Sequence, residues 1–312
     1  MIECGVLDEI EITILAEDTI GFDTPLMGRF GLSMYLALKT RESEKKILFD
    51  TNSAANPVLN NLSVLGKSLG DVSAIFLSHC HYDHTDGLAG ILDALDRPIP
   101  VIGHPETFRP CFEINPDGLR QIGMGYSRQE LESKGAQFKL VREPFNLMTG
   151  VVTTGEVERV TEYETLEELY TIVDGKTLQD PERDDVSLIL CTRLGLVIVT
   201  GCAHSGIVNT ILTARCVTGI EKIFAVIGGL HFMDASSEKI EKSIRFLSEN
   251  VAYVYAGHCT GFDGCSLLRE ELHDRFQKIT TGMTIHISSE SDIPLVSSMT
   301  TATRDRHRTL YG

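Results

Sequence analysis

Residues 79–84 form the stretch of this sequence best suited to bind a metal. They contain three of the ten histidines of the chain and one aspartate: His79, His81, Asp83 and His84. Neutral imidazoles and carboxylates are ligands that Zn²⁺, Mn²⁺ and Fe²⁺ share. The apolar run at 72–77 predicts a buried strand before them. We therefore expect a metal-binding loop beyond the carboxyl end of a strand, where open α/β sheets place their sites.

Three later strands are each followed by a glycine and, within three residues, a histidine. The apolar runs end near residues 200, 227 and 255, and the histidines are His204, His231 and His258. Glycine lets the backbone turn sharply and approach a ligand closely. The recurrence predicts that these three side chains join the loop at 79–84, with six histidines at one edge of a sheet.

The elements that must position these residues are short apolar strands alternating with helical patterns. We expect further strands at 10–14, 31–40, 46–50, 186–190 and 284–288, with 186–190 and 196–200 forming a hairpin. Helical patterns cover 54–68, 205–216, 240–247 and 267–276.

Two regions differ from this alternation. Residues 105–180 are rich in charged residues, glycine and proline, and they contain a capping box at Ser127 to Glu130. We interpret them as an insertion or lid in a single domain that spans 1–312. The tail after residue 290, rich in Ser and Thr, is expected to be poorly ordered.

Composition limits the classes of partner. The formal net charge is −16, and no compensating Lys/Arg cluster is present, which argues against nucleic acids and anionic membranes as partners. No run approaches the roughly 20 apolar residues of a membrane span. The N-terminus lacks an export signal, so we expect a cytoplasmic protein. A small anionic substrate would need local positive charge, which a divalent metal can supply. Whether the protein forms a homo-oligomer is left open.

The eight cysteines of the chain form no CxxC pair, which disfavours zinc ribbons and iron–sulfur clusters. Reduced, buried thiols are the expectation for most of them.

The run His79-x-His81-x-Asp83-His84 resembles the metal motif of the metallo-β-lactamase superfamily, and Asp50 after an early strand fits the same pattern. The resemblance implies an α/β fold, a four-layer α/β/β/α sandwich. It also implies one or two divalent metal ions at the sheet edge, with zinc expected first and manganese or iron as alternatives.

The segments at 201–206, 228–231 and 257–261 look like the group of dihydropterin-methyl-ribofuranosylaminobenzene-phosphate synthases of methanopterin biosynthesis. That resemblance implies an enzyme in which a dihydropterin-methyl diphosphate loses diphosphate to an aminobenzene nucleophile. A metal-dependent hydrolase of a phosphoester or acyl substrate uses the same ligands and stays open. A third hypothesis is a metal-binding sensor without catalytic activity.

The resemblance also assigns ligands. His79 and His81 would bind the first metal, and Asp83 and His84 the second, with His258 as a late-strand ligand. Asp83 is also counted among the catalytic residues.

Cys202 departs from the superfamily pattern, because many members carry a bridging aspartate after this strand. A thiolate can ligate zinc, but a small buried residue is an equally good interpretation of Cys202. We expect His204 to supply the remaining imidazole.

Four residues around the ligands receive supporting roles. His231 is expected to contact substrate or act as a general acid, and Asp50 to orient the metal loop through hydrogen bonds. Asp86 would do likewise or cap the next helix. Ser205 precedes a helix whose free N–H groups could hold a phosphate, although helix capping alone explains it as well.

Overall fold

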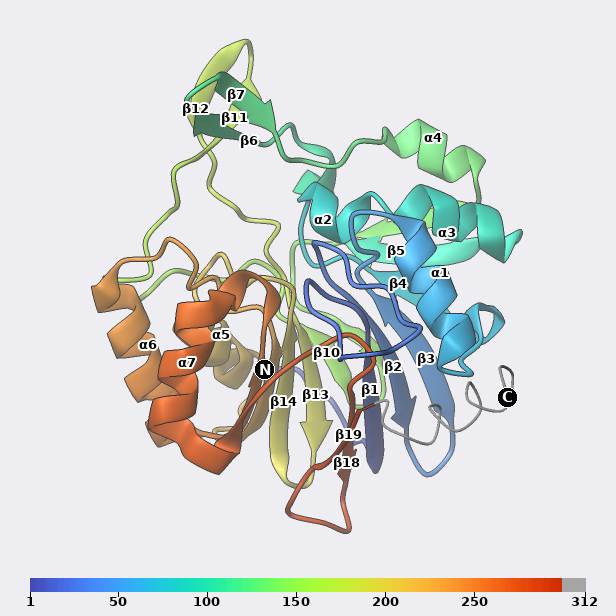
Figure 1. Ribbon diagram of the computed structural model, residues 1–312, viewed down its shortest axis with the longest axis vertical. Helices are drawn as coiled ribbons and strands as arrows, with labels where there is room; N and C mark the ends of the chain where they lie inside the picture. Colours follow the sequence, from blue (N-terminus) through green and yellow to red (C-terminus); the bar gives the residue numbers. More distant parts are fainter. Residues whose placement is uncertain (299–312) are drawn as a thin grey trace.

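The computed structural model describes residues 1–298, which form two large β-sheets packed face to face between two layers of helices (Figure 1). Helices α1, α3 and α4 lie with the first sheet, and α5, α6 and α7 cover the second. The expected four-layer α/β/β/α sandwich is confirmed.

The first sheet has eight strands in the order β19-β18-β1-β2-β3-β4-β5-β8. Their bounds are β1 Glu9–Ala16, β2 Ser33–Lys39, β3 Glu44–Phe49, β4 Ala74–Phe76, β5 Ile99–Gly103, β8 Ala136–Leu140, β18 Thr284–Ser288 and β19 Leu295–Ser297. Strands β3, β4, β5 and β8 run parallel to one another.

The second sheet has seven strands in the order β17-β16-β15-β14-β13-β10-β9. Their bounds are β9 Asn146–Met148, β10 Val151–Thr153, β13 Leu188–Thr192, β14 Gly195–Thr200, β15 Ile223–Gly228, β16 Val251–Ala256 and β17 Phe276–Lys278. β13 and β14 form the predicted hairpin, and β14, β15 and β16 are parallel.

The helices connect these strands and cover their outer faces. They are α1 Ala55–Val64, α2 Tyr82–Thr85, α3 Leu88–Leu95, α4 Arg128–Ser133, α5 Ile207–Thr218, α6 Ser237–Asn250 and α7 Gly261–Leu272. Short 3₁₀ helices occur at Leu69–Asp71, Pro105–Phe108, His258–Thr260 and His273–Arg275. Within residues 1–298, no helix has the length and apolarity needed to cross a bilayer.

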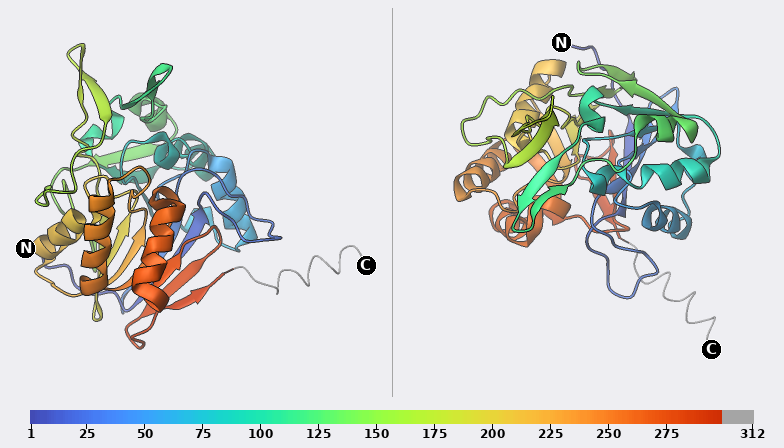
Figure 2. Two further views of the ribbon diagram at one scale, coloured as in Figure 1. Left: turned by 60° about the vertical axis from the view of Figure 1, so that its left-hand side comes forward. Right: turned by 90° about the horizontal axis from the view of Figure 1, so that it is seen from above.

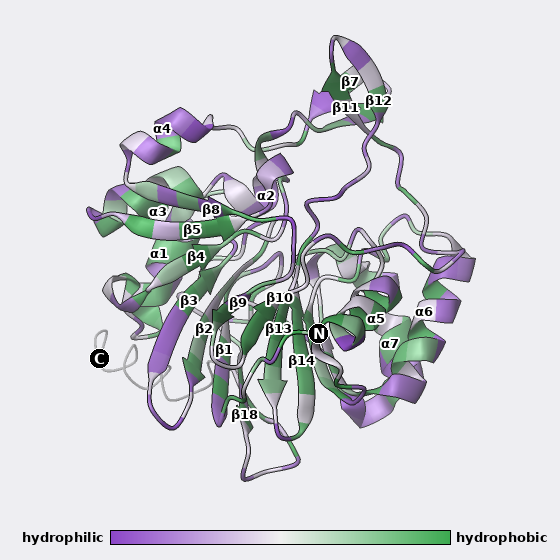
Figure 3. Cartoon of the chain, turned by 180° about the vertical axis from the view of Figure 1, so that it is seen from behind, coloured by the Kyte–Doolittle hydropathy of each residue, from purple (hydrophilic) through white to green (hydrophobic). Residues whose placement is uncertain are grey.

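Strand alternation explains how β14 contributes to two apolar cores at once. Val197 and Val199 of β14 face the core between the sheets, while Leu196 and Ile198 face α5, α6 and α7. Successive strand residues point to opposite faces, so a strand with both faces covered must be apolar throughout. Figure 3 shows this apolar interior between hydrophilic outer surfaces.

A third, four-stranded sheet stands apart from the sandwich, above one end of the two main sheets (Figures 1 and 2). It pairs two hairpins in the order β12-β11-β6-β7, with bounds β6 Phe112–Asn115, β7 Gly118–Gln121, β11 Leu169–Val173 and β12 Lys176–Gln179. The expected insertion at 105–180 is therefore too broad, because β8, β9 and β10 lie inside it and belong to the main sheets. Short strands between charged loops gave no periodic signal that could separate these parts.

The expectation of reduced, buried thiols is confirmed for most of the cysteines, since within residues 1–298 six are free and five of these are buried. Cys4 and Cys191 are the exception, because they form a disulfide whose Cα atoms are 6.6 Å apart, across 187 residues of sequence. The expectation for the tail needs correction. Leu295–Ser297 pairs with β18, so part of the tail after 290 is an ordered edge strand. The rest of that prediction, residues 299–312, lies outside the described residues.

Candidate metal centre

The carboxyl ends of parallel strands bring the predicted ligands to one edge of the sandwich. β4 leads into His79 and His81, and β14, β15 and β16 lead to His204, His231 and His258. The last two histidines have positive φ angles, 46° for His231 and 52° for His258. Non-glycine residues in this region cost energy and are held there by their surroundings, which is common at functional sites.

His79, His81 and His204 form the first cluster of donor atoms. Nε2 of His79 lies 3.1 Å from Nδ1 of His81, and the His204 ring packs against both imidazoles. One ring nitrogen from each residue lies within 4.8 Å of the others, and all three residues are buried. Nε2 of His204 has no hydrogen-bond partner among the described residues.

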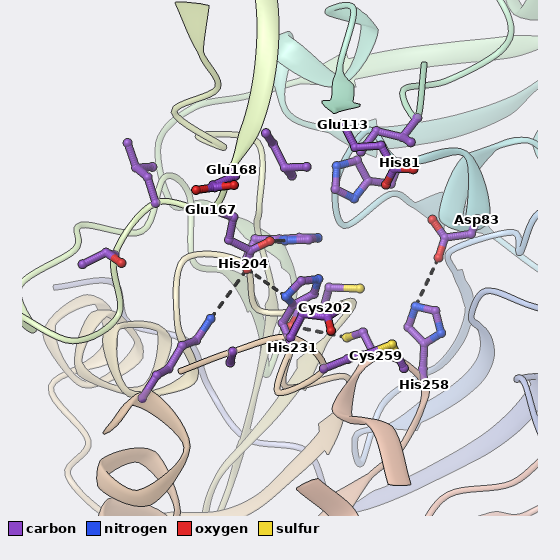
Figure 4. A pocket seen from close by; sticks show the side chains of 18 of the residues that line it. His81, Asp83, Glu113, Glu167, Glu168, Cys202, His204, His231, His258 and Cys259 are labelled. Atoms are coloured by element: carbon purple, nitrogen blue, oxygen red, sulfur yellow. Dashed lines mark hydrogen bonds and ion pairs between the residues drawn. The ribbon is translucent and has the colours of Figure 1, made fainter. Parts of the chain in front are cut away.

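Asp83, His84 and His258 form the second cluster. Nε2 of His84 is 3.2 Å from Nε2 of His258, and Oδ2 of Asp83 is 3.2 Å from the same His258 nitrogen. Asp83 Oδ2 is also 3.5 Å from His84 Nε2. Three donor atoms thus lie within 4.8 Å of one another beside the first cluster. Figure 4 shows the contact between Asp83 and His258.

Cys202 lies between the two clusters. Its Sγ is 3.2 Å from Nε2 of His84, and it groups with His79 of the first cluster as well as His84 of the second. The thiol therefore occupies a place between the two sets of donors, where many superfamily members would carry a bridging carboxylate. A second thiol, Cys259, groups with Cys202 and His258.

Asp50 links the metal loop to the second cluster. Its fully buried carboxylate accepts hydrogen bonds from the backbone N–H and the hydroxyl of Ser78, each 2.7 Å long, and from Nδ1 of His84, also 2.7 Å. Because Nδ1 is engaged in this way, Nε2 of His84 is the nitrogen that could bind a metal. A Cβ on Gly201 would lie 2.1 Å from Ser78 Oγ, so only glycine allows the two sheets to meet here.

Carboxylates distant in sequence orient the histidines, and sequence reasoning missed them. Nδ1 of His204 contacts Glu167 at 3.1 Å and Glu182 at 3.4 Å. Nδ1 of His258 contacts Asp18 at 3.2 Å, and its backbone N–H donates to Glu17. No local motif predicts these partners, because each carboxylate comes from a loop far in sequence from the histidine that it contacts.

Cys111 is a further residue that the sequence did not indicate. Its Sγ is 3.5 Å from Nε2 of His81, so it contacts the ring nitrogen that faces away from His79. Cys80 and Cys111 are both fully buried beside this imidazole. Cys80 lies between His79 and His81 in the loop, and Cys111 packs with it in one small buried cluster.

The electrostatics favour three of the donors, His79, His81 and Asp83, in their metal-binding forms. Burial, and then the neighbouring His84 imidazole, hold the pKa of His79 well below its usual value. Burial and His204 do the same to the pKa of His81. Burial alone would raise the pKa of Asp83, but His84 and His258 outweigh it and hold that pKa well below its usual range. A neutral imidazole and an ionised carboxylate are the ligand forms that metals require. Burial alone would lower the pKa of His204 and of His258, but Glu167 beside His204 and Asp18 beside His258 outweigh it and raise the pKa of each well above its usual value.

The centre opens into a cavity of about 720 Å³. The candidate ligands His81, Asp83, His204 and His258 lie in its wall, together with Cys202 and Cys259. The third sheet supplies the opposite wall through Glu113, Arg120 and Leu169. A cavity of this size suits a small organic substrate.

His231 lies at the rim of this centre. Its Nδ1 is 2.8 Å from Oε1 of Glu167, and its ring centroid is 4.2 Å from that of His204. The side chain is 24% exposed and faces the cavity, unlike the buried ligand histidines. This position is compatible with contact to a substrate.

Two supporting roles predicted from the sequence are wrong. Asp86 accepts the backbone N–H of Gly125 at 2.8 Å and makes no side-chain cap on α3. The N–H groups at the start of α5 do not face a phosphate site, because the buried carboxylate of Glu164 accepts those of Val208 and Asn209 at 2.9 Å. The cap comes from 44 residues away, which a local pattern cannot reveal.

The donor set fits a bound metal. The unpartnered Nε2 of His204 and the converging nitrogens of the other imidazoles leave lone pairs that a cation would satisfy. The two buried His/Asp clusters are typical of the dinuclear site of metallo-β-lactamase-type proteins.

Comparisons with known proteins agree with this geometry. The family model of the metallo-beta-lactamase superfamily matches residues 28–217. The chain is 34% identical over 291 residues to the 7,8-dihydropterin-6-methyl-4-(β-D-ribofuranosyl)-aminobenzene-5′-phosphate synthase of Methanocaldococcus jannaschii, covering 91% of this chain and 99% of that one. An uncharacterised protein of the same organism is 30% identical and covers 73% of this chain and 84% of its own length.

Solved structures share the fold. A metal-dependent hydrolase of the β-lactamase superfamily superimposes with a TM-score of 0.76 at 24% identity, covering 89% of this chain and 99% of that chain. Zinc-bound PqqB from Methylobacterium extorquens gives a TM-score of 0.50 at 10% identity, covering 88% of this chain and 99% of that chain.

Proposed function

The chain belongs to the metallo-β-lactamase superfamily as a metal-dependent enzyme, and on that premise we propose that it is a synthase of the dihydropterin type. It would join a 7,8-dihydropterin-6-methyl group to 4-(β-D-ribofuranosyl)aminobenzene 5′-phosphate. The observation that carries the proposal is the 34% identity to a synthase of that name along 99% of its length and 91% of this chain.

In the proposed reaction, the arylamine nitrogen forms a bond to the pterin methylene carbon. The bond from that carbon to the diphosphate oxygen breaks, diphosphate leaves, and the amine loses one proton. Bound metal would supply Lewis acidity that neutralises charge on the leaving group. We expect zinc, with manganese or iron as alternatives, because the donors are imidazole, carboxylate and thiol.

The residues of the chain would hold the metal and position the substrates. The two clusters and Cys202 surround the metal position, and His231 lies next to them with Nδ1 engaged by Glu167. Its Nε2 would accept the proton that the arylamine loses, so that His231 acts as a general base in this reaction instead of the general acid expected from the sequence. Phe30 and Tyr82, whose ring centroids are 6.0 Å apart, offer aromatic faces in the cavity wall to a flat pterin ring.

The test is a two-substrate assay with metal-loaded protein. Diphosphate release from dihydropterin-methyl diphosphate should require the arylamine phosphate and yield the coupled product. The His81→Ala variant should lose metal and activity but keep its fold, because it removes a donor of the first cluster.

A hydrolase would behave differently in the same assay. Diphosphate release that ignores the arylamine, together with cleavage of bis-p-nitrophenyl phosphate, would reject the synthase and favour a phosphoesterase. Elemental analysis of the purified protein then gives the identity and number of metal ions.

A further inference from the structure

Lys239 is a buried lysine whose side chain lines the cavity of the metal centre. It is the third residue of α6, a helix of 14 residues, and its backbone N–H donates to the N-cap Ser236 at 3.2 Å. Helical side chains lean toward the N-terminus of their helix, which here is also part of the cavity wall. Its side chain is 8% exposed.

The ammonium of Lys239 has hydrogen-bonding capacity that the protein does not use. Its nearest charged partner is Oε1 of Glu167, at 3.6 Å, and no hydrogen bond to Nζ is present within residues 1–298. An ammonium has three donors, and in Lys239 they are open to the cavity that the side chain lines. The other cation of the wall, Arg120, is already bound to Glu113 and to the hydroxyl of Tyr82, each at 3.0 Å.

Glu167 cannot balance Lys239 by itself, because the same carboxylate serves two imidazoles. Oε1 of Glu167 is 2.8 Å from His231 and Oε2 is 3.1 Å from His204 (Figure 4). Asp234 also lines this wall but is exposed to solvent. Because Glu167 contacts both Lys239 and His204, a ligand bound to Lys239 would lie close to the first metal cluster.

We propose that Lys239, together with the first turn of α6, binds a phosphoryl group of the substrate. The positive end of the α6 dipole favours an anion even though Ser236 already accepts the N–H of Lys239, and the ammonium supplies a full positive charge in a chain of net charge −16. The group is either the distal phosphate of the diphosphate or the 5′-phosphate of the arylamine. The assignment to one of these two phosphates rests on the proposed function, whereas the binding of a phosphoryl group by Lys239 does not.

The first test measures binding without turnover. Zinc-loaded wild type and Lys239→Met are titrated calorimetrically with inorganic phosphate and inorganic diphosphate. Methionine keeps most of the length of the side chain without its charge. Loss of a charge-assisted hydrogen bond should weaken binding of at least one anion by about tenfold or more.

The matched control is Arg245→Met, which removes a cation from an exposed position on the same helix. It should bind both anions within about twofold of wild type. Equal affinity of Lys239→Met and wild type for both anions would overturn the proposal. If Lys239→Met does not fold or does not load zinc, Lys239→Arg takes its place. That variant should retain anion binding because it keeps the charge, and a loss of binding in folded, zinc-loaded Lys239→Arg counts against the proposal.

Steady-state kinetics separate the two sources. If Lys239 binds the diphosphate, Lys239→Met raises KM for the pterin substrate. If it binds the 5′-phosphate, Lys239→Met raises KM for the arylamine phosphate. With the riboside that lacks the phosphate, Lys239→Met and wild type should then have the same KM. An unchanged KM for both substrates in an active variant contradicts the inference. If wild type has no synthase activity, the proposed function fails while the calorimetric result still decides the role of Lys239.

Discussion

Replacing Asp50 by asparagine should weaken metal binding without disturbing the shape of the site. The Oδ1 atom of Asp50 accepts the backbone N–H of Ser78, so an asparagine must keep its oxygen there and turn its NH₂ toward His84. Nδ1 of His84 must then accept a hydrogen bond, which moves the ring proton to Nε2. Because Nε2 is the nitrogen that faces Asp83 and His258, the second cluster loses a lone pair.

The magnitude follows from this loss of one orienting carboxylate. Removing such a partner lowers metal affinity by about 10–100-fold, which corresponds to roughly 1.4–2.7 kcal/mol. The metal-free protein also loses a charge-assisted hydrogen bond in a fully buried place, worth about 1.5–3 kcal/mol. We therefore expect Asp50→Asn to lower both zinc affinity and the free energy of unfolding.

Competition with a chromophoric zinc chelator measures the affinity, and urea unfolding of the metal-free protein measures the stability. Asp86→Asn is the matched control, since Asp86 only accepts the N–H of Gly125 and an amide oxygen can do the same. Wild-type zinc affinity in Asp50→Asn would refute the assignment of His84 Nε2 as a ligand atom.

Three other perturbations test separate parts of the structure. Arg109→Met should cost about 3–5 kcal/mol in urea unfolding, because the guanidinium pairs with the buried Asp180 and Asp184; a cost below about 1 kcal/mol would contradict that. Burial raises the pKa of Glu164 above its usual 4.5, so the folded state holds the proton more tightly and loses stability as pH rises from about 4.5 through the raised value. Glu164→Gln should lack this decline, and parallel stability profiles of the two proteins would disprove it. Removing metal with a chelator should lower the melting temperature, and free zinc at 100 times its Kd should restore about 2.7 kcal/mol; a melting temperature independent of zinc would argue against a metal bound to the folded state.

The fold and most of the metal centre could be predicted because their signals are local. The alternation of residues 196–200 and the sequence from His79 to His84 lie within a few positions of one another. Parallel strands place their carboxyl ends at the same edge, so each strand followed by Gly and His adds a side chain there without knowledge of long-range contacts. The superfamily motif then supplied the arrangement of layers.

The boundaries of the insertion and the helix caps could not be predicted in this way. β8, β9 and β10 are short and flanked by charged loops, so only pairing with β5 and β13 identifies them as parts of the main sheets. The cap that Glu164 provides for α5 has no local signal either, because Glu164 lies 44 residues before Val208.

The sequence by itself determined that imidazoles and a carboxylate gather at a sheet edge, because strand periodicity and glycine turns fix that locally. Only the tertiary structure decided which groups orient them and what else faces the cavity. Asp18, Glu167 and Lys239 come from three separate segments, and they meet at the centre only when both sheets and the insertion are assembled. Contacts of this kind depend on the position of whole elements in space, which no short pattern of residues encodes.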